Sequence, residues 1–130
     1  MSDDPMIRWH DLVRTRNVAG LDVLLADDVV FHSPVVHTPQ AGKAITRSYL
    51  AAAFAVFFSE SFRYVRQVKG ARDAVLEFKV VIDGIEVNGV DMIRWNDAGR
   101  IDDFKVMLRP LKAVNLIHQR MAAMLQSQQQ

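Results

Sequence analysis

The fold is decided by residues 85–95, which read IEVNGVDMIRW. Successive side chains of a β-strand point to opposite faces of the sheet, so every second residue shares a face. One of the two faces is apolar apart from a single carboxyl group, that of Asp91. This alternation predicts a long strand that turns its apolar face toward the interior. That face consists of Ile85, Val87, Gly89, Asp91, Ile93 and Trp95.

Similar strands are predicted on both sides of this stretch. Residues 76–82 alternate apolar and polar side chains, and residues 83–84 (DG) give a strong hairpin signal because both residue types tolerate positive φ. Residues 96–99 (NDAG) predict a second turn, and residues 104–108 alternate again. Together with the alternation that begins at Phe62, the pattern predicts a meander of antiparallel strands.

Helices are predicted before and after these strands, because apolar side chains recur there at steps of three and four residues. Two short helices are expected within residues 7–25, closed by the Asp-Asp pair at 27–28. A long helix covers residues 43–58, and a C-terminal helix runs from about 110 to 126. Helices and strands that segregate in this way indicate an α+β fold, with helices packed on the concave face of a curved sheet.

The composition excludes several classes of function. The chain of 130 residues fits one domain, with its core in about residues 6–110 and a polar tail at 127–130. Sixteen Lys and Arg against fifteen Asp and Glu give a net charge of +1, without the basic excess that nucleic-acid binding requires. The absence of cysteine excludes disulfides, thiolate catalysis and Cys-ligated metals. We expect no cofactor and no nucleic-acid partner.

Membrane association is not expected either. The most apolar run, residues 49–58, has half the length of the roughly 20 residues that a membrane-spanning helix needs. The N-terminal residues 1–5 (MSDDP) are acidic, whereas a signal peptide begins basic and then becomes apolar. A cytoplasmic protein is the expectation.

Asp91 is the most informative position for chemistry. Burial removes hydration from a carboxylate, which disfavours its charged form and should raise its pKa. A protonated Asp91 could donate a hydrogen bond to a ligand carbonyl or to a developing oxyanion. The alternative is a structural aspartate that is satisfied by a backbone N–H or a nearby arginine.

The other polar candidates give weaker signals. His32 and His37 flank Pro34, but a metal site would need a third ligand, and His32 is equally well explained as a strand residue opposite Phe31. No metal site is predicted. The Asp-Asp pair at 102–103 is expected to point to opposite faces of a strand. The first of the two has the inward parity but is expected to be solvated, because it lies at the rim beside the turn.

Several of these segments resemble a known family. The stretches 25–31 (LADDVVF) and 33–35 (SPV), Gly42 at the start of a helix, and 91–101 (DMIRWNDAGRI) are similar to the SnoaL-like, ketosteroid isomerase-like members of the nuclear transport factor 2-like superfamily. The resemblance covers about residues 6–110. It implies a cone-shaped curved sheet whose helices close a deep pocket, usually in a homodimer.

The resemblance also suggests roles for individual residues. Steroid isomerases of this superfamily carry a base aspartate before the proline that follows the first strand, and here that position is Ser33. Their oxyanion-binding tyrosine on the first helix corresponds approximately to Trp9, and their protonated aspartate corresponds to Asp91. The missing base argues against steroid isomerisation by the familiar route. Other members of the superfamily are cyclases, hydrolases, dehydratases or ligand binders.

Two functions are therefore expected in competition. The first is an isomerase, cyclase or hydrolase acting on a small apolar, carbonyl-bearing or polycyclic molecule, with Asp91 as acid or hydrogen-bond donor. Its substrate-binding residues would be Trp9, His32, Ser33, Phe54 and Trp95. The second is a non-catalytic pocket that binds an apolar ligand after loss of the base.

A third hypothesis is a purely structural or assembly module that uses the outer face of the sheet as a dimer surface. The homodimer that it predicts is compatible with either of the first two functions. The outward-facing positions of the predicted sheet are more apolar than a fully solvated face requires, and they predict a homodimer through that face. The C-terminal helix either caps the pocket or packs across the dimer. The outward-facing apolar residues are Val75, Val81, Val90, Met92 and Met107.

Overall fold

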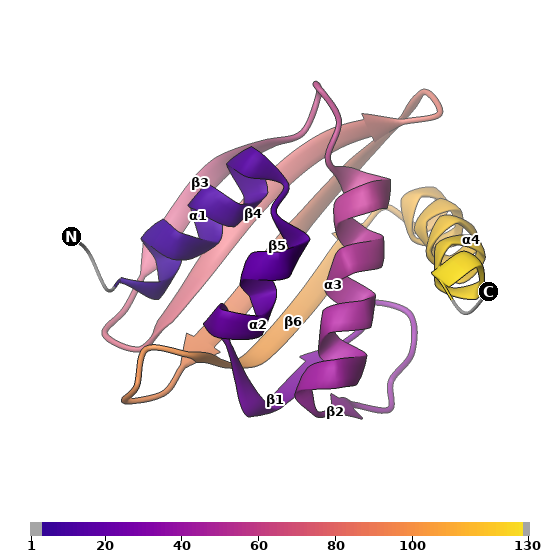
Figure 1. Ribbon diagram of the computed structural model, residues 1–130. Helices are drawn as coiled ribbons and strands as arrows, with labels where there is room; N and C mark the ends of the chain where they lie inside the picture. The colour runs from indigo at the N-terminus through magenta and orange to yellow at the C-terminus, as the bar shows by residue number, and fades with distance from the viewer. Residues whose placement is uncertain (1–3, 129–130) are drawn as a thin grey trace.

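The computed structural model describes residues 4–128, which form four α-helices and one six-stranded sheet (Figure 1). The helices are α1 (Pro5–Thr15), α2 (Leu21–Leu24), α3 (Lys43–Phe57) and α4 (Leu111–Gln128), with a single 3₁₀ turn, η1 (Val18–Gly20), before α2. The strands are β1 (Leu25–His32), β2 (Gln40–Ala41), β3 (Arg63–Lys69), β4 (Asp73–Ile82), β5 (Ile85–Trp95) and β6 (Ile101–Arg109).

The sheet is curved and unclosed, with the strand order β2-β1-β6-β5-β4-β3. All neighbouring strands are antiparallel except β1 and β6, which pair in parallel. In Figure 1, α1, α2 and α3 lie across one face of the sheet, and α4 lies beside α3 at one side. The predicted α+β fold with a curved sheet is confirmed.

Strand β5 has the bounds and the inward face that its alternation predicted. Its buried residues are Val87, Gly89, Asp91, Ile93 and Trp95, and the residues between them are half-buried or exposed. The strand lies between β4 and β6, where Asp91 is paired with Leu76 on one side and Val106 on the other. The predicted strand therefore places a carboxyl group in the middle of the sheet.

The first helix is positioned by its cap and by one large side chain. The Asp4 side chain caps α1 by accepting a hydrogen bond from the Met6 N–H (2.9 Å), which satisfies one of the free amide groups of the first turn. The indole ring of Trp9 is 2 % exposed. Its centroid lies 5.7 Å from that of Phe54 on α3 and 5.0 Å from that of Phe104 on β6. Trp9 thus packs α1 against both the sheet and the long helix.

The predicted helix end at Asp27-Asp28 is wrong, because both residues belong to β1. Helix α2 ends at Leu24, and pairing with β6 begins at the next residue, where Leu25 lies opposite Ile101. The strand pairing with a distant segment therefore decides the conformation of these residues, although the local spacing of apolar residues favoured a helix. The pairing of β1 with β6 is irregular between Leu25 and Val30. Asp27 and Asp28 lie in this irregular part of the strand, and both are exposed.

The C-terminal helix extends slightly farther than predicted and packs beside α3. Its observed range, residues 111–128, includes the first two residues of the predicted polar tail, and residues 129–130 lie outside the described part of the chain. The helix contacts α3, β5 and β6. Ala113 and Ile117 are fully buried there in a cluster with Phe57 and Phe78.

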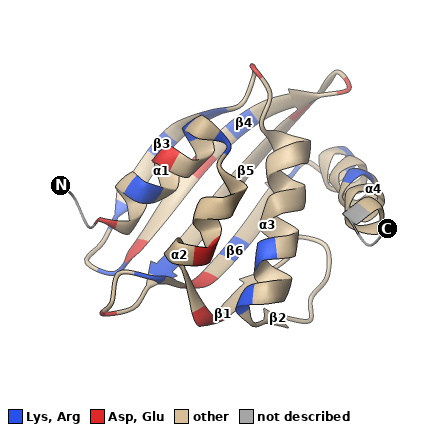
Figure 2. Ribbon diagram, in the orientation of Figure 1, with Lys and Arg blue, Asp and Glu red and all other residues tan. Residues whose placement is uncertain are grey.

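Charged residues of both signs are distributed over the molecule. In Figure 2, Lys and Arg occur near Asp and Glu on α1 and across the sheet. Among residues 4–128, no helix is long and apolar enough to cross a membrane.

Gly89 provides the space that the inner face of β5 needs. A Cβ atom at this position would lie 2.5 Å from Phe78 Cζ, 2.7 Å from Leu108 Cδ2 and 2.9 Å from the Met107 carbonyl oxygen. We predict that Gly89→Ala lowers the free energy of unfolding by about 1–3 kcal/mol, because the added methyl group overpacks the core. Urea denaturation checks this, with the exposed Glu86→Ala as the control on the same strand. An unchanged stability for Gly89→Ala would contradict the crowding argument.

Candidate functional site

A chain of two hydrogen bonds connects three distant segments around Asp91. The indole N–H of Trp9 on α1 donates to Tyr64 Oη on β3 (3.0 Å). The hydroxyl of Tyr64 in turn donates to Asp91 Oδ2 on β5 (2.8 Å). Within residues 4–128 this is the one hydrogen bond that the Asp91 carboxyl receives, and its second oxygen has unused capacity.

Burial changes the acidity of Asp91. The residue is 7 % exposed, and desolvation raises the pKa of its carboxyl group from 3.8 to about 7, partly offset by the hydrogen bond from Tyr64. The same burial raises the pKa of Tyr64 well above 10, with a further contribution from the charge of Asp91. Tyr64 therefore keeps its proton at neutral pH, whereas Asp91 populates both protonation states.

Asp91 lines a small, aromatic cavity, here called the inner cavity. Its volume is about 30 Å³, which is room for one or two water molecules. Among the residues that line it, Asp91 alone has an ionisable side chain. The others are Trp9, Leu50, Ala53, Phe54, Phe57, Phe58, Phe62, Phe78, Phe104 and Val106.

A larger cavity, here called the outer chamber, lies between α3, α4 and the loop after β1. Its volume is about 190 Å³. It shares Ala53, Phe57 and Val106 with the inner cavity, so the same three side chains contribute to the walls of both. The remaining lining residues are Phe31, Ser33, Pro34, Val35, Val36, Tyr49, Ile117, His118, Met121, Ala122 and Leu125.

Three of the predicted site residues come together. Asp91, Trp9 and Phe54 all line the inner cavity. Ser33 instead lines the outer chamber, where its Oγ accepts hydrogen bonds from the N–H groups of Val35 (3.1 Å) and Val36 (3.2 Å). Trp95 is buried in the main core and lines neither cavity.

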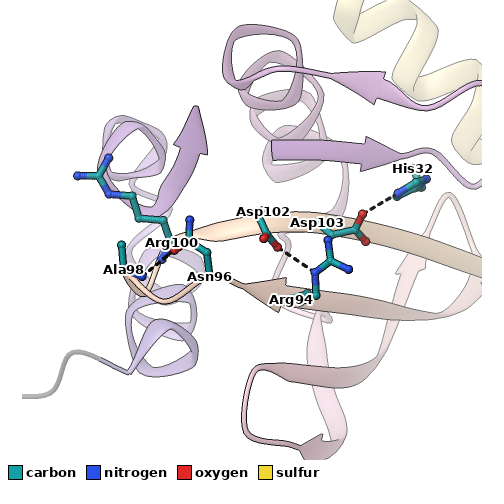
Figure 3. A network of polar contacts seen from close by, with 7 residues as sticks. All are labelled: His32, Arg94, Asn96, Ala98, Arg100, Asp102 and Asp103. Atoms are coloured by element: carbon teal, nitrogen blue, oxygen red, sulfur yellow. Dashed lines mark hydrogen bonds and ion pairs between the residues drawn. The ribbon is translucent and has the colours of Figure 1, made fainter. Parts of the chain in front are cut away.

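His32 lies in a separate polar network, shown in Figure 3. Its Nε2 atom is 2.9 Å from Asp103 Oδ1, and Arg94 donates to the neighbouring Asp102 (3.1 Å). The hydrogen bond to Asp102, together with the charges of Asp102 and Asp103, raises the pKa of Arg94. The structure therefore does not bring His32 to Asp91.

This network also corrects the predicted orientation of Asp102. An irregularity in the β5–β6 register pairs Arg94 with Asp103 but Trp95 with Ile101, which leaves Asp102 as an extra residue. Such a bulge breaks the two-residue alternation. Asp102 consequently contacts Arg94 instead of sharing the inward face of Phe104.

Tyr64 is the site residue that the sequence did not identify. The alternation of Phe62 and Tyr64 indicated an apolar strand face, but only the pairing of Tyr64 with Phe78 places its hydroxyl within reach of Asp91. In the described part of the chain, no three His, Asp or Glu side chains are grouped so that they could hold a metal ion.

Comparisons with known proteins identify similar sequences and folds. The SnoaL-like domain family matches residues 6–104. The chain is 40 % identical to a steroid delta-isomerase from Pseudomonas aeruginosa, covering 95 % of this chain and 90 % of that one with a TM-score of 0.89. It is 33 % identical to an uncharacterised protein with a cystatin-like fold from Silicibacter pomeroyi DSS-3, over 92 % and 83 % of the two chains (TM-score 0.84).

An NTF2-like protein of unknown function from Mesorhizobium loti shares the fold, with 21 % identity over 82 % of this chain and 88 % of that one (TM-score 0.70). No protein of curated function matches the chain.

The raised pKa of Asp91 predicts a specific dependence of stability on pH. In the folded protein, Asp91 keeps its proton up to about pH 7. In the unfolded chain its pKa has the ordinary value of 3.8, so the carboxyl group is ionised above about pH 4. Stability from this group is therefore lost as pH rises from about 4 to 7. Between pH 5 and pH 8 the wild type should lose roughly 2–3 kcal/mol more unfolding free energy than Asp91→Asn.

Urea denaturation of both proteins at the two pH values measures this difference. The side-chain amide of the Asp91→Asn variant can still accept the hydrogen bond from Tyr64, so the comparison isolates the charge. Parallel losses in the two proteins would show that Asp91 ionises normally.

Proposed function

This chain belongs to the SnoaL-like domain family, and from that premise we propose that it binds a small apolar molecule bearing a carbonyl group, with Asp91 as the acid or hydrogen-bond donor. The observation that carries the proposal is the buried Asp91 carboxyl, which lines an otherwise apolar cavity and receives one hydrogen bond among the described residues. Such a carboxyl can donate its proton to a carbonyl oxygen.

Isomerase-type chemistry is the reaction class we favour. The similar Pseudomonas protein is described as a steroid delta-isomerase, and 40 % identity over nearly the whole chain supports transfer of the reaction class. A hydrogen bond from Asp91 would stabilise the negative charge that develops on the carbonyl oxygen when a water molecule takes a proton from the neighbouring carbon, and the isomerisation is completed when a proton is returned to the far carbon of the double bond. Tyr64 is the positioning residue, because its hydroxyl holds Asp91 Oδ2 and leaves the other oxygen available.

Non-catalytic binding is the second candidate function. It is favoured by the absence, among the lining residues of the inner cavity, of a second ionisable group that could act as the base at carbon. Ser33, at the position that the resemblance gives to a base, accepts two backbone hydrogen bonds in a turn. A serine held in this way does not replace a carboxylate base.

The pH dependence of the affinity for a compact ketone tests whether binding depends on the proton of Asp91. The inner cavity has room for only one or two water molecules, so we expect the ring to lie in the adjoining outer chamber, with its carbonyl oxygen reaching Asp91 past the shared side chains of Ala53, Phe57 and Val106. We predict that 2-cyclohexen-1-one binds about tenfold more tightly at pH 6 than at pH 8, because Asp91, with a pKa of about 7, donates a hydrogen bond only when protonated. Isothermal titration calorimetry measures the two affinities. In Asp91→Asn the dependence on pH should disappear, and an equal dependence in that variant would refute the proposed role.

Turnover then distinguishes the two functions. The non-conjugated isomer, 3-cyclohexen-1-one, is incubated with the protein, and the conjugated product is followed by its ultraviolet absorbance. Product formation that is lost in Asp91→Asn supports the isomerase. Binding with no product in the wild type, and a gain of product in Ser33→Asp, supports a pocket that lacks its base.

We also propose a homodimer formed through the outer face of the sheet. Two neighbouring cross-strand pairs, Val75–Met92 and Val90–Met107, place four apolar side chains together on that face. Met92 and Met107 are 37 % and 50 % exposed, so the two pairs leave a contiguous apolar patch open to solvent. A second copy of the chain would bury this patch against its own equivalent.

Sedimentation velocity at micromolar concentration should give a species of twice the 14.7 kDa chain mass. We predict that Met107→Lys shifts it to the monomer, because a charge would be buried in an apolar interface. Leu111→Lys, at an exposed position on α4, is the matched control and should remain dimeric. A monomeric wild type would disprove the interface.

A further inference from the structure

One end of the sheet's outer face is acidic. Residues paired directly across antiparallel strands point to the same side of a sheet. The outward row at this end crosses β4, β5 and β6 and consists of Asp73, Arg94 and Asp103. Arg94 also donates to Asp102 (3.1 Å), which brings a third carboxylate to the row (Figure 3). The acidic end therefore has a net negative charge even if His32, which contacts Asp103, is protonated.

The opposite end of the same face is basic. The outward row there crosses β3, β4, β5 and β6 and consists of Arg63, Lys79, Asn88 and Arg109. Glu86 lies 3.8 Å from Lys79 Nζ and offsets one of the three cationic charges. Arg109 is exposed and has no ion-pair partner among residues 4–128. The basic end thus carries positive charge that the described part of the chain does not neutralise.

A mainly apolar band separates the two ends. It contains the pairs Val75–Met92 and Val90–Met107 described above, and it extends to Val68, which lies opposite Val75 and is 59 % exposed. An extra residue in β3 breaks the alternation of that strand and turns Val68 to the outer side. The band supplies apolar contact area, whereas the direction of contact is left to the charged ends.

The charges distinguish between two ways of packing a second copy on this face. In a symmetric dimer, the two-fold axis lies between the two sheets. An axis along the strands would place each acidic end against the acidic end of the partner. An axis across the strands reverses one sheet relative to the other, so that each acidic end lies against a basic end. Electrostatic complementarity favours the second arrangement.

We propose that the second copy packs with the two-fold axis across the strands, so that the acidic end of each copy contacts the basic end of the other. This orientation rests on the homodimer proposed above and specifies which charges meet in it. The axis would pass over the row Leu76–Asp91–Val106, which lies midway between the two charged rows. The two Asp91 sites would then face away from each other on opposite sides of the paired sheets.

The positions of the charges along each strand match this axis. On β4, Asp73 and Lys79 are equally far from the row that the axis follows, so Asp73 would face Lys79 of the partner subunit. On β6 the same holds for Asp103 and Arg109. Packed sheets cross at about 30°, and the long side chains of Lys79 and Arg109 can span the resulting offset.

Charge reversal on β4 tests the orientation. In a homodimer of Lys79→Glu, both symmetric contacts bring two carboxylates together, and in a homodimer of Asp73→Lys both bring two ammonium groups together. Sedimentation equilibrium should show at least a tenfold weaker dimer for each variant alone. A 1:1 mixture of the two should restore the dimer to within about threefold of the wild type, because in the mixed dimer both contacts join opposite charges.

The opposite packing gives the opposite result. With the axis along the strands, Lys79 would lie near Arg109 of the partner subunit, so Lys79→Glu would tighten the dimer and mixing would restore nothing. Either observation would overturn the proposed orientation. The same test on β6 uses Arg109→Glu mixed with Asp103→Lys.

Arg14→Glu is the matched control, because this exposed arginine lies on α1, in the helix layer on the other side of the sheet. Its dimer affinity should stay within twofold of the wild type. A dimeric wild type with unchanged affinity in both β4 variants would overturn the orientation alone. A wild type that is monomeric at micromolar concentration would overturn the homodimer and the orientation together.

Discussion

The cost of burying the Asp91 carboxyl is the constraint on which the site depends. A carboxylate on the inner face of a sheet loses its hydration, and one hydrogen bond from Tyr64 offsets only part of that loss. The group consequently holds its proton to about pH 7. Tyr64 is held in turn by the indole N–H of Trp9, so α1, β3 and β5 meet at a single polar chain. An otherwise aromatic interior thus contains one group that can change its charge near neutral pH.

The space around this group is set by the neighbouring side chains. Gly89, two residues before Asp91 on the same face, leaves room for the ring of Phe78. Aromatic side chains from α3 then reduce the free volume beside Asp91 to about 30 Å³. Helix α3 has a double role, because Ala53 and Phe57 also form part of the wall of the outer chamber. A change in either residue would therefore affect both cavities.

Membership of the SnoaL-like family determines the architecture but leaves the chemistry to individual residues. The resemblance to steroid isomerases gives three positions to reacting groups, and this chain has Asp91, Ser33 and Trp9 there. The hydroxyl of Ser33 stabilises a turn, and the indole N–H of Trp9 is engaged by Tyr64. The donor beside the carboxyl comes from β3 and not from the first helix. The serine at residue 33, held in its turn, is the reason why the second functional candidate is a pocket without a base.

Alternation and helical spacing are local properties, so the sequence alone was enough to predict the α+β class, strand β5 with its inward face, and the burial of Asp91. It misplaced the Asp pair at 27–28, and it gave Asp102 the wrong face. Both errors occur where the strand register is irregular, which depends on pairing with a distant strand. The three-dimensional structure was needed to show that Tyr64 contacts Asp91, that His32 lies in a separate network, and that α4 forms a wall of the chamber beside α3. These contacts join residues far apart in the chain, and no local pattern encodes the distances between them.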